Sequence, residues 1–153
     1  MLKLRFPPPV YAFAAGLVML GLRHYLPGPV VFPEPLAAWG WAGVAGGGLL
    51  TLWALAIFAG VHTTLNPYEP SKASRFVTHG PFRFSRNPMY LGYLTMLLGW
   101  AVWLDRLAVF AVPPLFALFI TLRQIVPEER ALTSLFGEPY VRYRQQVNRW
   151  LGG

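Results

Sequence analysis

Long apolar stretches alternate with short polar segments along the chain. This pattern predicts an all-α integral membrane protein with about four transmembrane helices. The apolar stretches cover about residues 9–22, 36–61, 88–104 and 107–122. A helix needs ~20 apolar residues to cross the hydrocarbon core of a bilayer. The second stretch meets this length without a charged residue, and the third and fourth are expected to pair as a hairpin. The first is the shortest and spans only if the residues at its ends are counted.

Composition and charge support the membrane interpretation and predict an orientation. Of the 153 residues, 55% are hydrophobic and 12% are charged, against about 25% charged in an average soluble domain. The formal net charge is +7, and all Lys and Arg residues except Arg23 and Arg106 lie in the amino end, the loop after the second stretch, or the tail after residue 122. The positive-inside rule then places both termini and this loop in the cytoplasm, with the protein in the inner membrane. We interpret the excess charge as contact with anionic membrane lipids and not with nucleic acid.

Several classes of site are excluded or disfavoured by the residue types present. The chain has no cysteine, so it forms no disulfide and has no thiolate ligand or nucleophile. The three histidines, His24, His62 and His79, do not have the spacing of metal ligands, so no metal site is expected. The basic residues before the first stretch resemble the start of a signal peptide. However, Arg23 follows where a small-residue cleavage site would lie, so we expect a retained anchor.

Glycine, proline and tryptophan positions predict details of the spans. Gly43 and the run Gly46-Gly47-Gly48 predict close helix contact in the second stretch. The pair Pro113-Pro114 is expected to kink or break the fourth. Tryptophans near the ends of the stretches are typical of belts at the membrane surface.

The polar loop at about residues 62–87 is too long to be a simple connector. It ends in a turn at Gly80-Pro81, and Asn87 followed by Pro88 is typical of a helix start. The first turn of that helix would offer backbone N–H groups and a positive dipole end to an anion, beside the charge of Arg86. A capped helix with an arginine reaching for the membrane surface is the alternative for these residues.

The tail repeats this pattern of proline followed by polar residues. We expect a helix to begin at Pro127, with Glu128 and Glu129 in its first turn and Gly137 at its end. A second helix is expected from Pro139, and its apolar positions fall on one face: Tyr140, Tyr143, Val147, Trp150 and Leu151. This amphipathic helix is expected to lie on the membrane or to close over the loop.

Two separated motifs resemble the isoprenylcysteine carboxyl methyltransferase and phospholipid methyltransferase superfamily. The first is Thr78-His79-Gly80-Pro81-Phe82 with the stretch from Ser85 to Gly92, and the second runs from Glu128 to Tyr143. They occur in the expected order, with one helical hairpin between them. Two positions depart from the eukaryotic pattern. Asn87 stands where those members usually have histidine, and Phe82 stands where they have tyrosine.

The resemblance implies an integral membrane enzyme that uses S-adenosylmethionine and a set of site residues. The expected cofactor-binding residues are Phe76, Val77, Thr78, His79, Gly80, Phe82, Arg86, Asn87, Pro88, Met89, Tyr90, Glu128 and Glu129. Tyr90, Arg123 and Glu128 are the expected catalytic residues. Arg123, as the nearest match to the acceptor-contacting arginine of the family, is expected to bind the acceptor with Tyr140, Tyr143 and Arg144.

We therefore expect a single methyltransferase domain over residues 1–153, with two spans in 1–61 and the cofactor-binding core in 62–153. The expected reaction moves a methyl group to a carboxylate, thiol or amine of a lipid or isoprenoid-like acceptor at the cytoplasmic membrane face. Membrane lipids and a lipophilic acceptor are the expected partners. Two alternatives stay open: an NADPH-dependent membrane reductase of the related sterol reductase type, and a small transporter or scaffold without catalysis.

Overall fold

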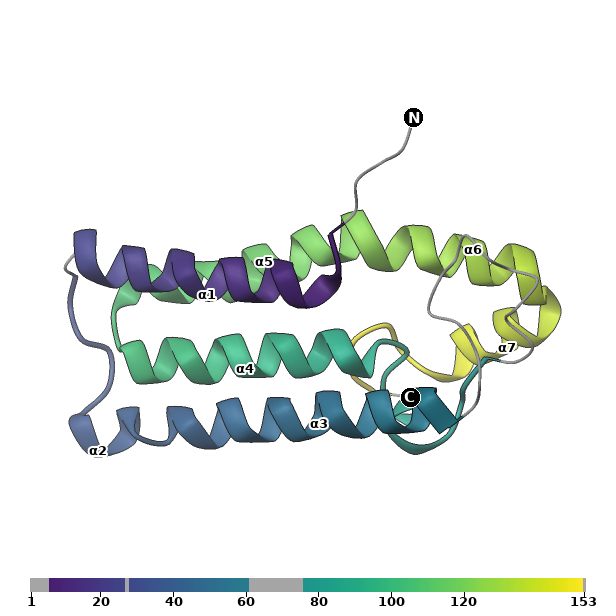
Figure 1. The fold of residues 1–153 in the computed structure, drawn as a ribbon, viewed down its shortest axis with the longest axis horizontal. Helices are drawn as coiled ribbons and strands as arrows, with labels where there is room; N and C mark the ends of the chain where they lie inside the picture. The colour runs from purple at the N-terminus through teal and green to yellow at the C-terminus, as the bar shows by residue number, and fades with distance from the viewer. Residues whose placement is uncertain (1–5, 27, 61–75, 153) are drawn as a thin grey trace. The chain divides into compact units, whose positions relative to one another are not determined.

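The computed structural model describes residues 6–26, 28–60 and 76–152, and every regular element in these ranges is helical. The sequence-based expectation of an all-α chain is confirmed over these residues. The predictions that rest on Lys3, Arg5 and the segment 61–75 lie outside the described residues. Figure 1 labels the α-helices. The elements in chain order are α1 (Pro8–Tyr25), α2 (Glu34–Ala37), α3 (Gly40–Gly60), η2 (Gly80–Arg83), α4 (Pro88–Leu104), η3 (Leu107–Ala111), α5 (Val112–Ile120), η4 (Thr121–Ile125), α6 (Val126–Phe136) and α7 (Glu138–Gln146).

Two helical segments are long and apolar enough to cross a membrane, namely α3 and the uninterrupted helical run Leu107–Phe136. Only 17% of the apolar window of α3 is buried within the protein. The core helix of a soluble protein would be mostly buried, so the exposed apolar surface of α3 is typical of a helix that faces lipid. Helix α4 has 17 residues and is shorter. The expected number of four spans therefore stays a prediction.

The chain forms two compact units, which are described separately. The first contains residues 1–48 and 92–120, and the second contains 49–91 and 121–153. The expectation of one domain with a division at residue 61 stays a prediction.

Glycines allow close backbone contact in the first unit. A Cβ atom added at Gly47 would lie 2.5 Å from the carbonyl oxygen of Gly92, and one at Gly43 would lie 2.9 Å from Cα of Gly99. An added Cβ at Gly46, in contrast, would meet nothing within 4 Å. Close contact in the second apolar stretch is therefore confirmed for Gly43 and Gly47 but not for Gly46 or Gly48, where an added Cβ would meet only Met96 Sδ at 3.9 Å. The glycines let the backbones of α3 and α4 approach more closely than larger side chains would allow.

A buried aspartate joins two connecting segments of the first unit. Asp105 has a positive φ of 49° and is 7% exposed. Its Oδ1 accepts hydrogen bonds from the backbone N–H groups of Val31 and Phe32, at 2.9 and 3.0 Å. The N–H of Leu107 donates to the carbonyl of Pro29 at 3.3 Å. These bonds satisfy backbone donors that the apolar surroundings would otherwise leave unpaired.

The prolines of the fourth stretch do not break its helix. Pro113 and Pro114 lie in the first turn of α5, directly after the 3₁₀ turn η3, where a missing N–H costs no helical hydrogen bond. The expectation that a helix begins at Pro127 is confirmed to within one residue, because α6 begins at Val126 and holds Pro127, Glu128 and Glu129 in its first turn. The π-helical turn η4 precedes Pro127 at the place where a regular helix would lose a hydrogen bond.

Two hydrophobic clusters form the core of the second unit. Val77 and Phe82 are buried with Ala54, and Ile57, Phe58 and Met89 pack against them. The second cluster joins the loop to α6 and α7 and consists of Tyr140, Tyr143, Val147, Phe76, Leu132 and Phe136. The apolar face of α7 is thus covered by protein, as in the expectation that this helix closes over the loop.

The end of α7 differs from the expectation. The helix stops at Gln146, and Val147 already has extended dihedral angles. Trp150 and Leu151 therefore lie beyond the helix, and Leu151 is 69% exposed. The predicted helical face ends at Val147 because the following residues form hydrogen bonds with the loop, as described below.

Candidate functional site

The loop before α4 is shaped by a tight turn against α3. Gly80 has φ of +61°, and a Cβ atom added there would collide with the side chain of Ile57. Glycine is therefore required at this position both by the dihedral angle and by the space. The side chains of Val77, Phe82 and Met89, three of the expected cofactor-binding residues, pack into the hydrophobic cluster on α3. Their expected contact with the cofactor stays a prediction.

Helix α4 begins at Pro88, as expected. The carbonyl of Asn87 accepts the first helical hydrogen bond, from the N–H of Leu91 at 3.0 Å. The Oγ of Ser85 accepts from the N–H of Asn87 at 3.0 Å. The Nδ2 of Asn87 donates to the carbonyl of Arg149 at 3.1 Å, so the amide of this motif residue contacts the segment after α7. The expected binding of an anion at this helix start stays a prediction.

Tyr90 and Glu128 come together although they are 38 residues apart. The Tyr90 hydroxyl donates to the Glu128 carboxylate, at 2.9 Å from Oε1 and 3.1 Å from Oε2. Tyr90 is 6% exposed, and Glu128 is half-buried. This hydrogen bond joins the two motifs that the sequence singled out, one on α4 and the other on α6.

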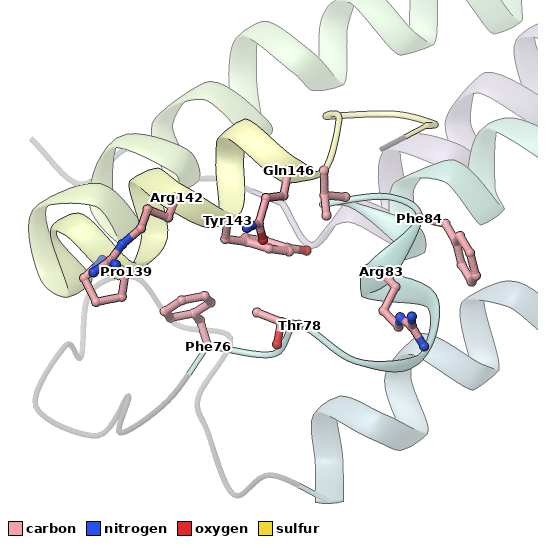
Figure 2. Close-up of a pocket in the computed structure, with 9 residues that line it drawn as sticks. Phe76, Thr78, Arg83, Phe84, Pro139, Arg142, Tyr143 and Gln146 are labelled. Atoms are coloured by element: carbon pink, nitrogen blue, oxygen red, sulfur yellow. The ribbon is translucent and has the colours of Figure 1, made fainter.

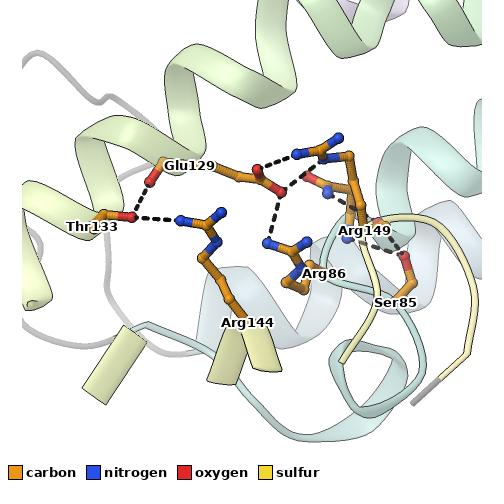
Figure 3. Close-up of polar contacts among 7 residues, drawn as sticks. Ser85, Arg86, Glu129, Thr133, Arg144 and Arg149 are labelled. Carbon is orange, nitrogen blue, oxygen red and sulfur yellow. Dashed lines mark hydrogen bonds and ion pairs between the residues drawn. The ribbon is translucent and has the colours of Figure 1, made fainter. Parts of the chain in front are cut away.

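The neighbouring acid, Glu129, binds two arginines (Figure 3). Arg86 Nη1 lies 2.8 Å from Oε1 of Glu129. Arg149 donates from Nε to Oε1 at 3.0 Å and from Nη2 to Oε2 at 2.7 Å. The side chains of Arg86 and Glu129 are 9% and 6% exposed. A buried carboxylate and an arginine that binds it in a bidentate manner form a strong ion pair with a defined orientation. Arg149 is not among the residues predicted for the site, because its position in the tail gave no indication of contact with Glu129.

Arg86 has hydrogen-bonding capacity that its described neighbours do not use. Its Nε and Nη1 atoms are buried and make no contact of hydrogen-bond geometry with any described residue, although Nη1 forms the ion pair with Glu129. Buried donors without an acceptor are rare in proteins and often lie at binding sites. The guanidinium of Arg86 thus contacts Glu129 and Tyr140 and keeps its Nε without a described acceptor.

Two tyrosines of α7 are buried beside this cluster. The Tyr143 hydroxyl donates to the carbonyl of Phe82 at 2.7 Å and thereby ties α7 to the loop. Burial raises the pKa of Tyr143 above its ordinary value, with a further contribution from Tyr140. The pKa of Tyr140 is also raised, first by burial and then by the negative charge of Glu129. Both hydroxyls therefore stay protonated at neutral pH.

A pocket of about 580 Å³ opens between the loop and α7 (Figure 2). Three of the expected site residues, Phe76, Thr78 and Tyr143, contribute to its wall. The sequence interpretation missed the others, and the signal that could have found them is their place next to the motifs: Arg83, Phe84, Pro139, Arg142, Gln146 and Val147. Its charged lining residues are both arginines. Tyr90 and Glu128 are not part of the wall. The pocket and the Tyr90–Glu128 hydrogen bond are therefore separate features of the second unit.

The remaining expected residues do not converge on these features. His79 and Arg123 are exposed. Arg144 is exposed and contacts Thr133 of α6, with Nη1 3.4 Å from Oγ1 (Figure 3). The expected role of Arg123 and Arg144 in acceptor binding stays a prediction. No group of three or more potential metal ligands occurs among the described residues.

Comparisons with known proteins connect this site to a family. The family model for phospholipid methyltransferase matches residues 36–139. An uncharacterized protein of Haemophilus influenzae is 44% identical over 63 residues, which cover 41% of this chain and 100% of that protein. Methanethiol S-methyltransferase 1 of Bradyrhizobium diazoefficiens is 32% identical over 91 residues, or 58% of this chain and 31% of that enzyme.

A solved structure shows the same fold. The eukaryotic intramembrane Ras methyltransferase ICMT (isoprenylcysteine carboxyl methyltransferase) matches with a TM-score of 0.66 and 25% identity, over 96% of this chain and 53% of that chain. This chain thus spans about half the length of that structure and about a third of the methanethiol enzyme. The resemblance drawn from the two motifs is confirmed, and the chain belongs to the phospholipid methyltransferase family.

Proposed function

We propose that this protein is an integral membrane methyltransferase that binds S-adenosylmethionine and methylates a lipophilic acceptor. The observation that carries the proposal is the meeting of the two motifs. Tyr90 contacts Glu128 at 2.9 Å, and Arg86 contacts Glu129 at 2.8 Å. Membership of the family and the apolar surface of α3 support the same conclusion.

The described residues fit the polar groups of S-adenosylmethionine. Its carboxylate would accept from the buried Nε of Arg86, which has no hydrogen-bond acceptor among the described residues, beside the Nη1 that already contacts Glu129. Its amine or ribose hydroxyls would donate to Glu128, which is half-buried and held by Tyr90. Glu129 is less suited to direct contact, because Arg86 and Arg149 already bind both of its oxygens. We therefore assign Glu129 to orienting Arg86.

The pocket beside α7 offers complementary groups for an adenosyl moiety. Phe76 and Tyr143 supply aromatic faces, and Thr78 and Gln146 supply hydrogen-bonding groups. Its volume of about 580 Å³ lies within the range of small-molecule sites, ~300–1,000 Å³. We assign it to the cofactor as a secondary contact.

The catalytic contribution of the chain is mainly alignment. S-adenosylmethionine supplies an electrophilic methyl group on a sulfonium, and the transfer is an in-line displacement. Fixing two reactants in line can contribute ~7–11 kcal/mol to lowering a barrier. Tyr90 and Glu128 would orient the donor, and the apolar faces of the helices would admit the acceptor from the bilayer. A carboxylate or thiolate acceptor would require no general base from the protein.

The acceptor class is proposed as a lipid or isoprenoid-like molecule with a carboxylate, thiol or amine. The two named relatives act on different compounds, because one is a methanethiol S-methyltransferase and the other an isoprenylcysteine carboxyl methyltransferase. The charge distribution supports a site on the cytoplasmic side of an inner membrane, since the motif arginines Arg83 and Arg86 lie in the same loop.

Isothermal titration of the purified protein in detergent with S-adenosylhomocysteine tests the proposal. We expect micromolar binding by the wild type and at least tenfold weaker binding, or ~1.4 kcal/mol, by Glu128→Gln and Tyr90→Phe. Arg130→Gln is the control, because Arg130 is an exposed arginine of the same helix that does not line the pocket. No binding by folded wild-type protein would contradict the proposal. A melting temperature raised by NADPH alone would favour the reductase alternative.

A further inference from the structure

The segment 147–152, which follows α7, forms hydrogen bonds along the first motif. The N–H of Arg86 donates to the carbonyl of Asn148 at 3.0 Å, and the N–H of Gly152 donates to the carbonyl of Phe84 at 3.1 Å. The segment also closes on itself, since the N–H of Asn148 donates to the carbonyl of Gly152 at 2.8 Å. The backbone at residues 84–87 is thus held by a part of the chain more than 60 residues away.

Arg149 is the residue of this segment that contacts both motifs (Figure 3). Its carbonyl accepts from Ser85 Oγ at 3.3 Å and from Asn87 Nδ2 at 3.1 Å. Its guanidinium donates two hydrogen bonds to Glu129, at 3.0 and 2.7 Å. The backbone of Arg149 therefore holds the start of α4, and its side chain holds α6.

The chemistry of the guanidinium suits this bridging role. A guanidinium presents its donors in a planar fork that matches the two oxygens of a carboxylate, whereas a lysine ammonium is a point charge. The hydrogen bonds to Glu129 raise the pKa of Arg149 further, so its guanidinium stays protonated. Because Glu129 also binds Arg86, the fork of Arg149 restricts the orientation of the acid on which Arg86 rests.

We propose that Arg149 is a positioning residue that fixes the spacing between the motif on α4 and the acids on α6. Asn87 lies three residues before Tyr90, and Glu129 directly follows Glu128. Because Arg149 binds both Asn87 and Glu129, it restrains the segments that present Tyr90 and Glu128 to each other. The effect on cofactor binding rests on the proposed function, whereas the effect on the geometry of residues 85–87 does not.

Two substitutions separate the side chain of Arg149 from its backbone. Arg149→Gln removes the charge and the fork, Arg149→Lys keeps the charge without the fork, and both keep the carbonyl that binds Asn87. Arg130→Gln is the matched control on α6. Phe136→Leu, in the hydrophobic cluster of α7, controls for a general loss of stability.

Hydrogen exchange and ligand binding are measured on the same detergent-solubilised full chain. We expect Arg149→Gln to raise the exchange rates of the Arg86 and Asn87 amides at least tenfold and to weaken S-adenosylhomocysteine binding at least tenfold. Arg149→Lys should fall between Arg149→Gln and the wild type. Phe136→Leu should lower the melting temperature without a selective change at these two amides.

The outcomes distinguish this proposal from the proposed function. Exchange rates at the Arg86 and Asn87 amides that are unchanged in Arg149→Gln would overturn the positioning role, whether or not the ligand binds. Faster exchange with unchanged ligand affinity would also overturn it. If the wild type does not bind S-adenosylhomocysteine at all, the proposed function fails, and the exchange measurement alone decides whether Arg149 positions the motif.

Discussion

The two compact units are held together by different kinds of contact. In the first, contact between α3 and α4 depends on missing side chains, since Gly43 and Gly47 face Gly99 and Gly92. In the second, contact between the motifs depends on long charged side chains, since Glu129 binds Arg86 and Arg149. Each unit also contains a buried acid, but Asp105 accepts from backbone amides while Glu129 accepts from guanidiniums.

This difference suggests that the first unit is the scaffold and that the second unit contains the groups of the candidate site. Contacts between glycines of two helices rest on van der Waals attraction between closely packed atoms. They suit apolar helices in a membrane, where the hydrophobic effect does little to bring the helices together. An arginine–carboxylate network is directional and places specific atoms. The motif residues Arg86 and Glu129 lie in the second kind of environment, next to the contact of Tyr90 with Glu128.

The largest expected effect comes from neutralising the shared acid of the second unit. Glu129→Gln leaves the buried Arg86 without its counter-ion, and breaking a buried ion pair typically costs ~3–5 kcal/mol. We expect a large drop in melting temperature and loss of S-adenosylhomocysteine binding. Glu138→Gln, at an exposed acid of α7, is the control. Equal melting temperatures for the two variants would mean that the network contributes little to stability.

A smaller effect is expected from a single methyl group in the first unit. In Gly47→Ala the added Cβ would lie 2.5 Å from the Gly92 carbonyl and 2.7 Å from the Met96 nitrogen. Both are backbone atoms, so the helices must separate, at ~1–3 kcal/mol. The adjacent Gly46→Ala meets nothing within 4 Å and is expected to be neutral or stabilising by up to ~1 kcal/mol through helix propensity. Thermal unfolding in detergent compares the pair, and a change of the same sign in both would contradict the glycine interface.

The hydrogen bonds that Asp105 accepts in the first unit can be tested by replacing its carboxylate. Asp105→Ala removes the carboxylate that accepts from the N–H groups of Val31 and Phe32, at ~1–2 kcal/mol for partly buried hydrogen bonds to a charged acceptor. Asp105→Asn keeps an acceptor oxygen and tolerates the positive φ, so it should retain most of the stability. We expect neither variant to change S-adenosylhomocysteine affinity, and a selective loss of affinity in Asp105→Asn would contradict the separation of scaffold and chemistry.

The smallest effect is expected from the hydroxyl of Tyr143. Tyr143→Phe loses the bond to the Phe82 carbonyl, worth ~1 kcal/mol. Because burial raises the pKa of the folded-state hydroxyl, this stabilisation is fully present below the unfolded-state pKa of about 10. It declines as pH rises above that value, since the unfolded chain then releases the proton first. Unfolding measured from pH 8 to 11 should show a weaker alkaline decline in Tyr143→Phe than in the wild type, and parallel curves would contradict this assignment.

Much of the fold was predictable because it depends on local pattern. The apolar stretches, the helix start at Pro88 and the helix end at Gly137 follow from hydropathy and from the backbone preferences of proline and glycine. The errors arose where one local signal was outweighed by its context. The apolar positions of Trp150 and Leu151 predict that α7 continues, but the helix ends at Gln146 and the following residues form hydrogen bonds with the loop.

The candidate site was predictable as a set of residues but not as a set of contacts. Tyr90 and Glu128 were both singled out, and their meeting supports the grouping of the two motifs. The importance of Arg149 was not visible, because a basic residue in a polar tail is ordinarily solvated. Nor could the sequence separate Glu128 from Glu129, which are adjacent and chemically identical yet have different partners.

By itself, the sequence determined the helical class, the apolar segments and the two motifs, since these depend on residues close together along the chain. Only the tertiary structure decided that Glu129 is bound by two arginines, that Gly47 but not Gly46 lies in a helix contact, and that segment 147–152 binds the start of α4. The physical reason is that hydrogen bonds and close packing act over a few ångströms, and residues far apart in sequence reach such distances only through the fold.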